Sequence, residues 1–391
     1  MKPASAAVFC LCCASSTALG AGMPARIAPS RALLLPGNPF AAPGPGGRYE
    51  TPASLACVYG LTAPVHGCNP ETLNAVAAGG GGVIAVVQAY DDPNAANDLS
   101  VFSAQFGLLP VNGSNFSVVY ARGTQPPPDP RGDFDLDDAL DIELAHALAP
   151  GAAIVLVEAA ADTTPEVMYA EQVAGQIVST AGGGEVVNSW CAAEWPPEQQ
   201  YESDFAAANT VYFASAGDKP GPCWPAVLPN VVGVGGTSIN RDAQANFLSE
   251  TSWAQTGGGP SMYVPRPSYQ NAVRKIVGAA RGTPDMAAVG NPATGVWVYD
   301  SAPYYGRVPY WLTVGGTSVS TPIGAAIVNN AGRFAASTEA ELAVVYGNRK
   351  NASDWRDITT GMCNNPNQGG NARKGYDFCT GVGAPVGRGG K

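Results

Sequence analysis

Histidine, charge and long apolar runs are scarce in this chain of 391 residues. His66 and His146 are its only histidines, so chemistry that needs an imidazole has two candidates. Charged residues make up 13% and the formal net charge is −10, with no basic stripe to offset it. We therefore expect neither nucleic acid nor a membrane surface as a partner. After the first twenty residues, no apolar run approaches the length of a membrane span.

The first twenty residues have the pattern of a secretory signal peptide. Lys2 supplies the positive charge, the apolar run extends from Ala6 to Ala14, and small residues near Gly20 suit cleavage. A membrane anchor is the alternative, but the run is too short to span a bilayer. We expect residues 1–20 to be a signal peptide, residues 21–48 a Pro/Gly/Ala-rich linker, and regular structure to begin near Tyr49. The protein would then be secreted, to the extracellular space or the periplasm.

Six cysteines follow the expected signal peptide, and an even number in an exported chain indicates disulfides. A zinc site is the competing interpretation, and the absence of a CxxC pair among these six weakens it. Proximity in the sequence favours the pairs Cys57–Cys68, Cys191–Cys223 and Cys363–Cys379.

Apolar, β-branched runs alternate with helical stretches along the chain. Runs of this length are typical of strands buried on both faces. The alternation predicts an α/β fold with a mostly parallel central sheet, and functional groups are expected at the carboxyl ends of its strands. The expected strands lie at 82–87, 153–157, 186–189, 210–215 and 231–235, and the expected helices at 137–148 and 165–181.

Ser318 follows the run Gly315-Gly316-Thr317 and precedes a stretch of small and branched apolar residues. A helix beginning there would place the hydroxyl at the positive end of the helix dipole, where negative charge is stabilised. A nucleophilic serine is one interpretation, and a helix-capping serine is the other.

A nucleophilic serine needs a base, and neither histidine has a strong catalytic context. His66 lies in a short loop before Cys68, and His146 lies in an apolar helical stretch that suits a packed core residue. Carboxylates are the natural substitutes for histidine in this chain.

The densest group of carboxylates spans residues 133–141. Asp137 and Asp141 are four residues apart and therefore share one face of a helix. Repulsion raises the pKa of one member of such a pair, which suits a base supported by a partner acid at low pH. An acidic first turn of a helix and a calcium-binding loop are the alternatives. Asp218 directly follows an expected strand, where a solvated turn aspartate is the alternative.

Several segments together resemble the sedolisins, which are serine-carboxyl peptidases with a subtilisin-like fold. The resemblance extends from about Tyr49 to Pro385. The segments that carry it, in order, are 84–94, Leu140-Asp141-Ile142-Glu143, 149–152, Asn188-Ser189-Trp190, Gly217-Asp218, 234–237, 257–259, 284–287, Gly316-Thr317-Ser318 and 357–359.

The resemblance implies a serine-type peptidase that acts on proteins or peptides through an acyl-enzyme. Ser318 matches the nucleophile, Asp137 stands at the position of the base, and Asp141 matches the acid that supports the base. Asp218 matches an acid that stabilises the oxyanion. Because Asp218 donates a hydrogen bond only while protonated, activity at acidic pH is expected.

The chain departs from the family at three places. The family has glutamate at the position of Asp137, and aspartate is one methylene shorter. Cys191 stands where a glycine is usual, and Lys219-Pro220 replaces small residues after Gly217-Asp218. Cys191 and Lys219-Pro220 lie near the expected substrate cleft.

The C-terminal segment resembles the calcium site of the family, and one structural Ca²⁺ is the expected cofactor. A hard cation prefers an all-oxygen shell of this kind. A solvated loop closed by a Cys363–Cys379 disulfide is the alternative. The expected ligands are the carboxylates of Asp357 and Asp377 and the carbonyls of Ile358, Arg373 and Gly375.

We expect residues 49–391 to form one catalytic domain in a monomer, and the long N-terminal prodomain typical of the family to be missing. Two other functions stay open. A catalytically impaired sedolisin-like protein would act as a peptide- or surface-binding module through the same cleft. A subtilisin-type peptidase would instead use Asp91 or Asp92 with His146.

Overall fold

Parallel strands that are apolar on both faces build the centre of the protein. The structure is a computed structural model that describes residues 26–30, 32–34, 49–63, 65–196, 198–304, 306, 310–363 and 370–391, with 32–34 and 66 described through the main chain only. An eight-stranded sheet has the order β10-β9-β8-β6-β3-β5-β4, and β13 pairs with β9. All of its pairings are parallel except that of β10 with β9. The strands are β3 (Val83–Ala89), β4 (Phe116–Tyr120), β5 (Ala153–Ala159), β6 (Gly184–Asn188), β8 (Thr210–Ser215), β9 (Val232–Arg241), β10 (Phe247–Ser252) and β13 (Met286–Val289).

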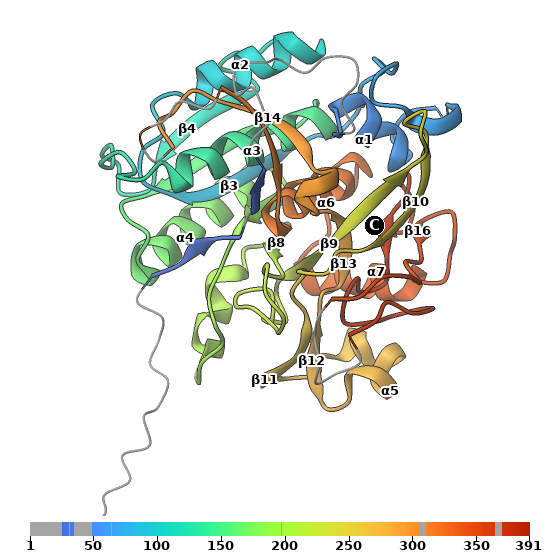
Figure 1. Ribbon diagram of the computed structural model, residues 1–391. Helices are drawn as coiled ribbons and strands as arrows, with labels where there is room; N and C mark the ends of the chain where they lie inside the picture. Colours follow the sequence, from blue (N-terminus) through green and yellow to red (C-terminus); the bar gives the residue numbers. More distant parts are fainter. Residues whose placement is uncertain are drawn as a thin grey trace, which may run out of the picture.

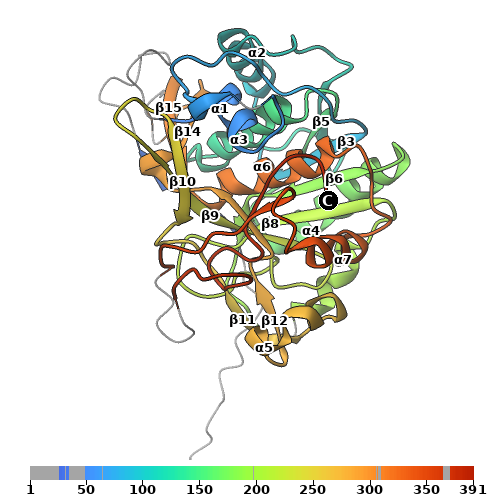
Figure 2. The ribbon, with the colours of Figure 1, turned by 90° about the vertical axis from the view of Figure 1, so that its right-hand side faces the viewer.

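Helices cover both faces of this sheet (Figures 1 and 2). Successive strand residues point to opposite faces, so Ile84 and Val86 enter one core while Ala85 and Val87 enter the other. α3 and α6 pack in the first core and α4 in the second. The predicted α/β fold is confirmed. The α-helices are α1 (Pro52–Val58), α2 (Ala95–Phe106), α3 (Asp133–Leu148), α4 (Thr164–Thr180), α5 (Arg274–Val277), α6 (Thr317–Asn330) and α7 (Thr338–Asn348).

Shorter elements surround the sheet, and several of them border the functional site. The short strands are β1 (Ala28–Pro29), β2 (Ala32–Leu34), β7 (Trp190–Cys191), β11 (Gly259–Pro265), β12 (Ala280–Thr283), β14 (Val296–Asp300), β15 (Tyr310–Gly315), β16 (Trp355–Arg356) and β17 (Ala384–Pro385). The 3₁₀-helices are η1 (His66–Cys68), η2 (Glu198–Phe205), η3 (Ser268–Val273) and η4 (Pro292–Thr294).

The expectation that regular structure begins near Tyr49 is wrong. β1 pairs with β7, and β2 pairs with β15, both antiparallel. These two strands have two and three residues, so they carry no periodicity that could be recognised in the sequence. They exist because residues distant in the sequence supply their hydrogen-bonding partners.

The three disulfides expected from sequence proximity are present: Cys57–Cys68, Cys191–Cys223 and Cys363–Cys379. All six cysteines are therefore committed to sulfur–sulfur bonds, which overturns the zinc alternative. In the described part of the chain, no helix has the length and apolar content needed to cross a membrane. The expected signal peptide, residues 1–20, lies outside the described residues.

Candidate active site

Ser318 is the second residue of α6, which follows β15 through a sharp turn. Gly316 precedes the helix with a φ of +122°, a conformation that side chains with a Cβ rarely adopt. This turn places Ser318 fully buried at the positive end of the helix. Its hydroxyl donates a hydrogen bond to the carbonyl oxygen of Ser189, at 2.8 Å. The sequence prediction of a serine at a helix N-terminus is confirmed.

Asp141 is connected to Ser318 through Ser189. Both aspartates of the predicted pair lie on α3, and both are fully buried. Asp141 accepts hydrogen bonds from the Ser189 hydroxyl at 2.6 Å and from the Gln88 side-chain amide at 2.8 Å. The Ser189 hydroxyl also lies 3.2 Å from the carbonyl oxygen of Ser318. Ser189 follows β6 and Gln88 lies in β3, so the central sheet holds this acid in place.

Burial, and then the negative charge of Asp137, raise the pKa of Asp141 well above the usual range of an aspartate. The hydrogen bonds from Ser189 and Gln88 act in the opposite direction and are the weaker influence. The raised pKa favours the protonated form of Asp141 beside Asp137.

Asp218 is fixed beside the start of α6. Gly217 turns the chain after β8 with a φ of +94°. One carboxylate oxygen of Asp218 then accepts hydrogen bonds from the amide and from the hydroxyl of Thr317, both at 2.8 Å. Thr317 Oγ1 also accepts a hydrogen bond from the Gly217 amide, at 3.1 Å. The carboxyl group of Asp218 is thus anchored on the residue that precedes Ser318.

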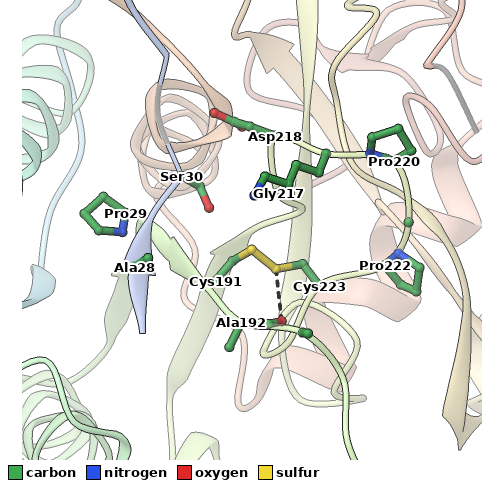
Figure 3. A pocket seen from close by; sticks show the side chains of 13 residues that line it. Ala28, Pro29, Ser30, Cys191, Ala192, Gly217, Asp218, Pro220, Pro222 and Cys223 are labelled. Carbon is green, nitrogen blue, oxygen red and sulfur yellow. Dashed lines mark hydrogen bonds between the residues drawn. A yellow bond between two sulfur atoms is a disulfide. The ribbon is translucent and has the colours of Figure 1, made fainter. Parts of the chain in front are cut away.

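A pocket of about 430 Å³ opens beside these groups. Residues 191–193 form one wall, residues 217–223 form another, and residues 28–30 border it on a third side (Figure 3). The Cys191–Cys223 disulfide joins the first two walls. The residues that depart from the family pattern, Cys191 and Lys219-Pro220, therefore line this pocket.

His146 takes no part in this arrangement. It lies nine residues after Asp137 on the same helix and is fully buried. One ring nitrogen lies 2.9 Å from the carbonyl oxygen of Leu109, and burial lowers the pKa of the imidazole. The structure therefore gives the subtilisin-type alternative, with Asp91 or Asp92 and His146, no support.

The two expected calcium-binding carboxylates reach the same turn. Both oxygens of Asp357 accept from the Gly375 amide, at 3.1 and 2.9 Å, and Asp377 accepts from the Arg373 amide at 2.9 Å. Asp377 is fully buried, and burial raises its pKa to about 6. Among the described residues, no cluster of three or more His, Cys, Asp or Glu side chains suits a metal ion. A calcium ion here would depend on main-chain carbonyls for most of its ligands.

Sequence reasoning missed the supporting roles of Gln88, Ser189 and Thr317, which it used only as parts of longer motifs. Gln88 could have been noticed, because it is a polar residue inside an otherwise apolar strand. Ser30 was also missed. Its amide donates to Ser318 Oγ at 3.1 Å, and nothing in its local sequence indicates that contact.

No family model matches the chain. Kumamolisin from Bacillus sp. (strain MN-32) is 30% identical over 356 residues, which cover 81% of this chain and 60% of the relative. Sedolisin from Pseudomonas sp. (strain 101) is 26% identical over 330 residues, which cover 73% of this chain and 53% of the relative. The chain belongs to the sedolisin family. It spans little more than half the length of these two sedolisin-family relatives.

Solved structures agree with the fold of a sedolisin. The structure of Pseudomonas sedolisin, a serine-carboxyl proteinase complexed with two molecules of pseudo-iodotyrostatin, superposes with a TM-score of 0.69. It is 21% identical and covers 86% of this chain and 95% of the solved one. Human tripeptidyl-peptidase 1 is 36% identical over 147 residues, covering 30% of this chain and 23% of the relative.

Proposed function

We propose that this protein is a secreted, acid-acting serine-carboxyl peptidase that cleaves proteins or peptides through an acyl-enzyme. The observation that carries the proposal is the connection of Ser318 to buried carboxyls. Asp141 contacts Ser189, whose carbonyl accepts the Ser318 hydroxyl, and Asp218 is anchored on Thr317. The described histidine side chain, that of His146, contacts Leu109 instead.

The proton of Ser318 would pass to Asp137 as the hydroxyl attacks a peptide carbonyl. The raised pKa of Asp141 favours its protonated form, and Asp137 would be the acceptor of the pair. The hydroxyl must first turn away from the Ser189 carbonyl. Asp137 would then return the proton to the leaving amine, and water would hydrolyse the ester on Ser318.

Negative charge develops on the carbonyl oxygen during attack. The Ser318 amide at the start of α6 would donate one hydrogen bond to it, and Asp218 would donate a second while protonated. Ionisation of Asp218 removes that donor and adds a repelling charge. Activity is therefore expected to fall as pH rises towards neutrality.

Secretion and calcium binding belong to the same proposal. Disulfides form and persist in oxidising compartments outside the cytosol, and three are present. The all-oxygen donors around the turn at 373–377 suit Ca²⁺, with Asp357 and Asp377 as the charged ligands. Bound calcium would supply a positive charge beside the buried Asp377.

Replacing Ser318 with alanine tests the proposal. With an unfolded protein as substrate near pH 4, Ser318→Ala is expected to reduce cleavage at least about 10³-fold, because the nucleophile is lost. A peptide aldehyde or a fluorophosphonate probe should label the wild type and not the variant, as read by mass spectrometry.

Ser320→Ala is the matched control. Ser320 is also buried in α6, but its hydroxyl contacts the carbonyls of Ala288 and Val289. This variant should still be labelled. Full cleavage by Ser318→Ala, or a wild type that neither cleaves nor accepts the probe, would contradict the proposed function and favour a binding module.

A further inference from the structure

The pocket beside the nucleophile is placed to receive one particular side chain of a bound peptide. Asp218, the expected oxyanion donor, lines the pocket and is anchored on Thr317, so the reacting carbonyl would lie at the entrance of the pocket. Ser30 marks the same position, because its carbonyl oxygen accepts from the Ser318 amide at 2.8 Å and the residue borders the pocket (Figure 3). The side chain expected in the pocket is therefore that of the residue whose carbonyl Ser318 would attack.

The two walls of this pocket consist mostly of small and apolar groups. Alanine, glycine and proline account for most of the lining, and the Cys191–Cys223 disulfide joins the walls. Such walls suit the methylene groups of a side chain, and the few polar groups of a pocket then decide which tip is accepted. Among the described residues that line the pocket, the charged ones are Asp218 and Lys219.

Lys219 brings an uncompensated positive charge to the pocket. Its side chain is exposed and, within the part of the chain that the structure describes, it takes part in no ion pair. The carboxylate of Glu194, which follows one wall, accepts from the Ser261 hydroxyl and the Met262 amide instead. Asp218 carries no charge while it is protonated, which is the state that the proposed mechanism requires. In that state the lysine alone gives the described lining a charge.

The loop that carries Lys219 is held at both ends. The carbonyl of Gly217 accepts from the amide of Gly257 at 2.6 Å, and the carbonyl of Gly221 accepts from the amide of Gly258 at 2.8 Å. The disulfide then fixes the loop to the opposite wall. The main chain is thus ordered before a peptide binds, and a contact with the lysine requires only its own side chain to become ordered.

We propose that this pocket selects an acidic side chain, that of glutamate or aspartate, at the residue before the cleaved bond, and that Lys219 determines this preference. The inference rests on the proposed function and names the substrate class. The carboxylate of the substrate pairs with the Lys219 ammonium while its methylene groups pack on the apolar walls. An amide of the same shape keeps the packing and loses the ion pair, and a lysine at that position meets a like charge.

The preference should be moderate in size and should depend on the ionisation of the substrate. An ion pair in a pocket that is open to water contributes little, so about three- to fivefold in kcat/KM is expected. The side chain of glutamate in a peptide has a pKa of about 4.3. The preference for glutamate over glutamine should therefore be present at pH 5 and absent at pH 3.

The experiment compares peptides that differ only at the residue before the cleaved bond, which is glutamate, glutamine or lysine. The kcat/KM of the full chain is measured at pH 5 and pH 3 from the linear phase of each progress curve, and mass spectrometry identifies the bond that is cut. At pH 5 the wild type should cleave the glutamate peptide about three- to fivefold faster than the glutamine peptide, and the lysine peptide most slowly. At pH 3 the glutamate and glutamine peptides should be cleaved alike.

Variants of Lys219 separate its charge from its size. Lys219→Met should cleave the glutamate and glutamine peptides alike at pH 5, Lys219→Arg should keep the preference, and Lys219→Glu should favour the lysine peptide. Lys275→Glu is the matched control, because it changes the net charge of the protein by the same amount on α5, outside the pocket lining. It should behave as the wild type, and thermal melts should show that all four variants are folded.

A wild type that cleaves the peptides without distinguishing glutamate from glutamine at pH 5 overturns this inference and leaves the proposed function standing. So does cleavage of the glutamate peptide at a bond other than the one after glutamate. A preference that persists in folded Lys219→Met, or that is lost in Lys275→Glu, excludes Lys219 as its source. A wild type that cleaves none of the peptides overturns the proposed function, and this inference with it.

Discussion

In the proposed function, Asp137 is the residue on which catalysis would depend most. In the structure, the Ser318 hydroxyl donates to a main-chain carbonyl of Ser189. A base must compete with the Ser189 carbonyl for the proton of Ser318. The side chain of Asp137 is one methylene shorter than that of the glutamate usual in the family, which puts it at a disadvantage. We therefore expect the reach of the Asp137 side chain to limit the rate, because proton transfer needs hydrogen-bonding distance.

Lengthening this side chain should speed the reaction. Asp137→Glu is expected to raise kcat about three- to tenfold with little change in KM, since the carboxylate comes about one carbon–carbon bond closer to Ser318. Asp137→Asn should lower kcat at least about 10³-fold, because an amide does not accept the proton. Steady-state kinetics on a peptide near pH 4 provides the measurement, with Asp133→Asn as the control. An Asp137→Asn enzyme that retains a tenth of the activity would exclude Asp137 as the base.

Among the elements, the core strands and helices could be predicted, and the strands that border the cleft could not. β3, β5 and β8 are mostly apolar runs, which burial on both faces of a parallel sheet favours. α6 follows a glycine pair that permits its sharp entry. β1 and β2 lie in Ala/Pro/Gly-rich sequence and are specified by their partners β7 and β15, so only the folded chain reveals them.

The residues of the candidate site also fall into two groups, those that could be predicted from the sequence and those that could not. Ser318 stands at a helix start, Asp218 follows a strand end and Asp141 lies in an acidic helical segment, and the structure places all three around the start of α6. Gln88 and Thr317 act through contacts 53 and 99 residues away in the sequence. Such contacts leave no local pattern, which is why these supporting residues were not predicted.

The turn at 373–377 should depend on calcium. Removing calcium with a chelator at pH 7 is expected to lower the Tm by several degrees, because the buried Asp377 and the exposed Asp357 lose their counter-charge. The effect should shrink below pH 6, where the raised pKa of Asp377 lets a proton compete with the ion. Scanning calorimetry of the inactive Ser318→Ala protein avoids self-digestion. Re-addition of Ca²⁺ but not Mg²⁺ should restore the Tm, and an Asp377→Asn variant that still responds would contradict the site.

At the scale of the whole molecule, buried acids are the prominent electrostatic feature. Burial is the main cause that raises the pKa of Asp92 to about 7 and those of Asp135 and Glu158 to about 8. Neighbouring carboxylates add to the effect. The pKa values of Asp138 and Glu143 are also raised well above the usual range of carboxyl groups, for the same reasons.

These shifts predict a protein that is most stable in acid. On unfolding, the carboxyls return to pKa values of about 4, so above pH 4 the unfolded chain binds fewer protons than the folded one. The stabilisation is complete below about pH 4 and is lost as pH rises through 7 to 8. The Tm of Ser318→Ala, measured from pH 4 to pH 8, should fall by about 10 °C or more.

Asp92→Asn offers an internal check on that prediction. An amide keeps the shape of the protonated acid and does not ionise, so the variant should lose less stability than its parent between pH 4 and pH 8. A Tm that rises over this range in the parent protein would show that the buried carboxyls are ionised in the folded state.

The Cys191–Cys223 disulfide has a consequence for the thermodynamics of recognition. It ties together the two walls of the pocket, which are otherwise a short strand and a glycine- and proline-containing loop. Ordering such a loop on each encounter with a peptide would cost conformational entropy and weaken binding. Here that entropy is lost once, when the sulfur–sulfur bond forms. In the proposed function, every later peptide would then meet a preorganised surface, and more of its contact energy would remain as affinity.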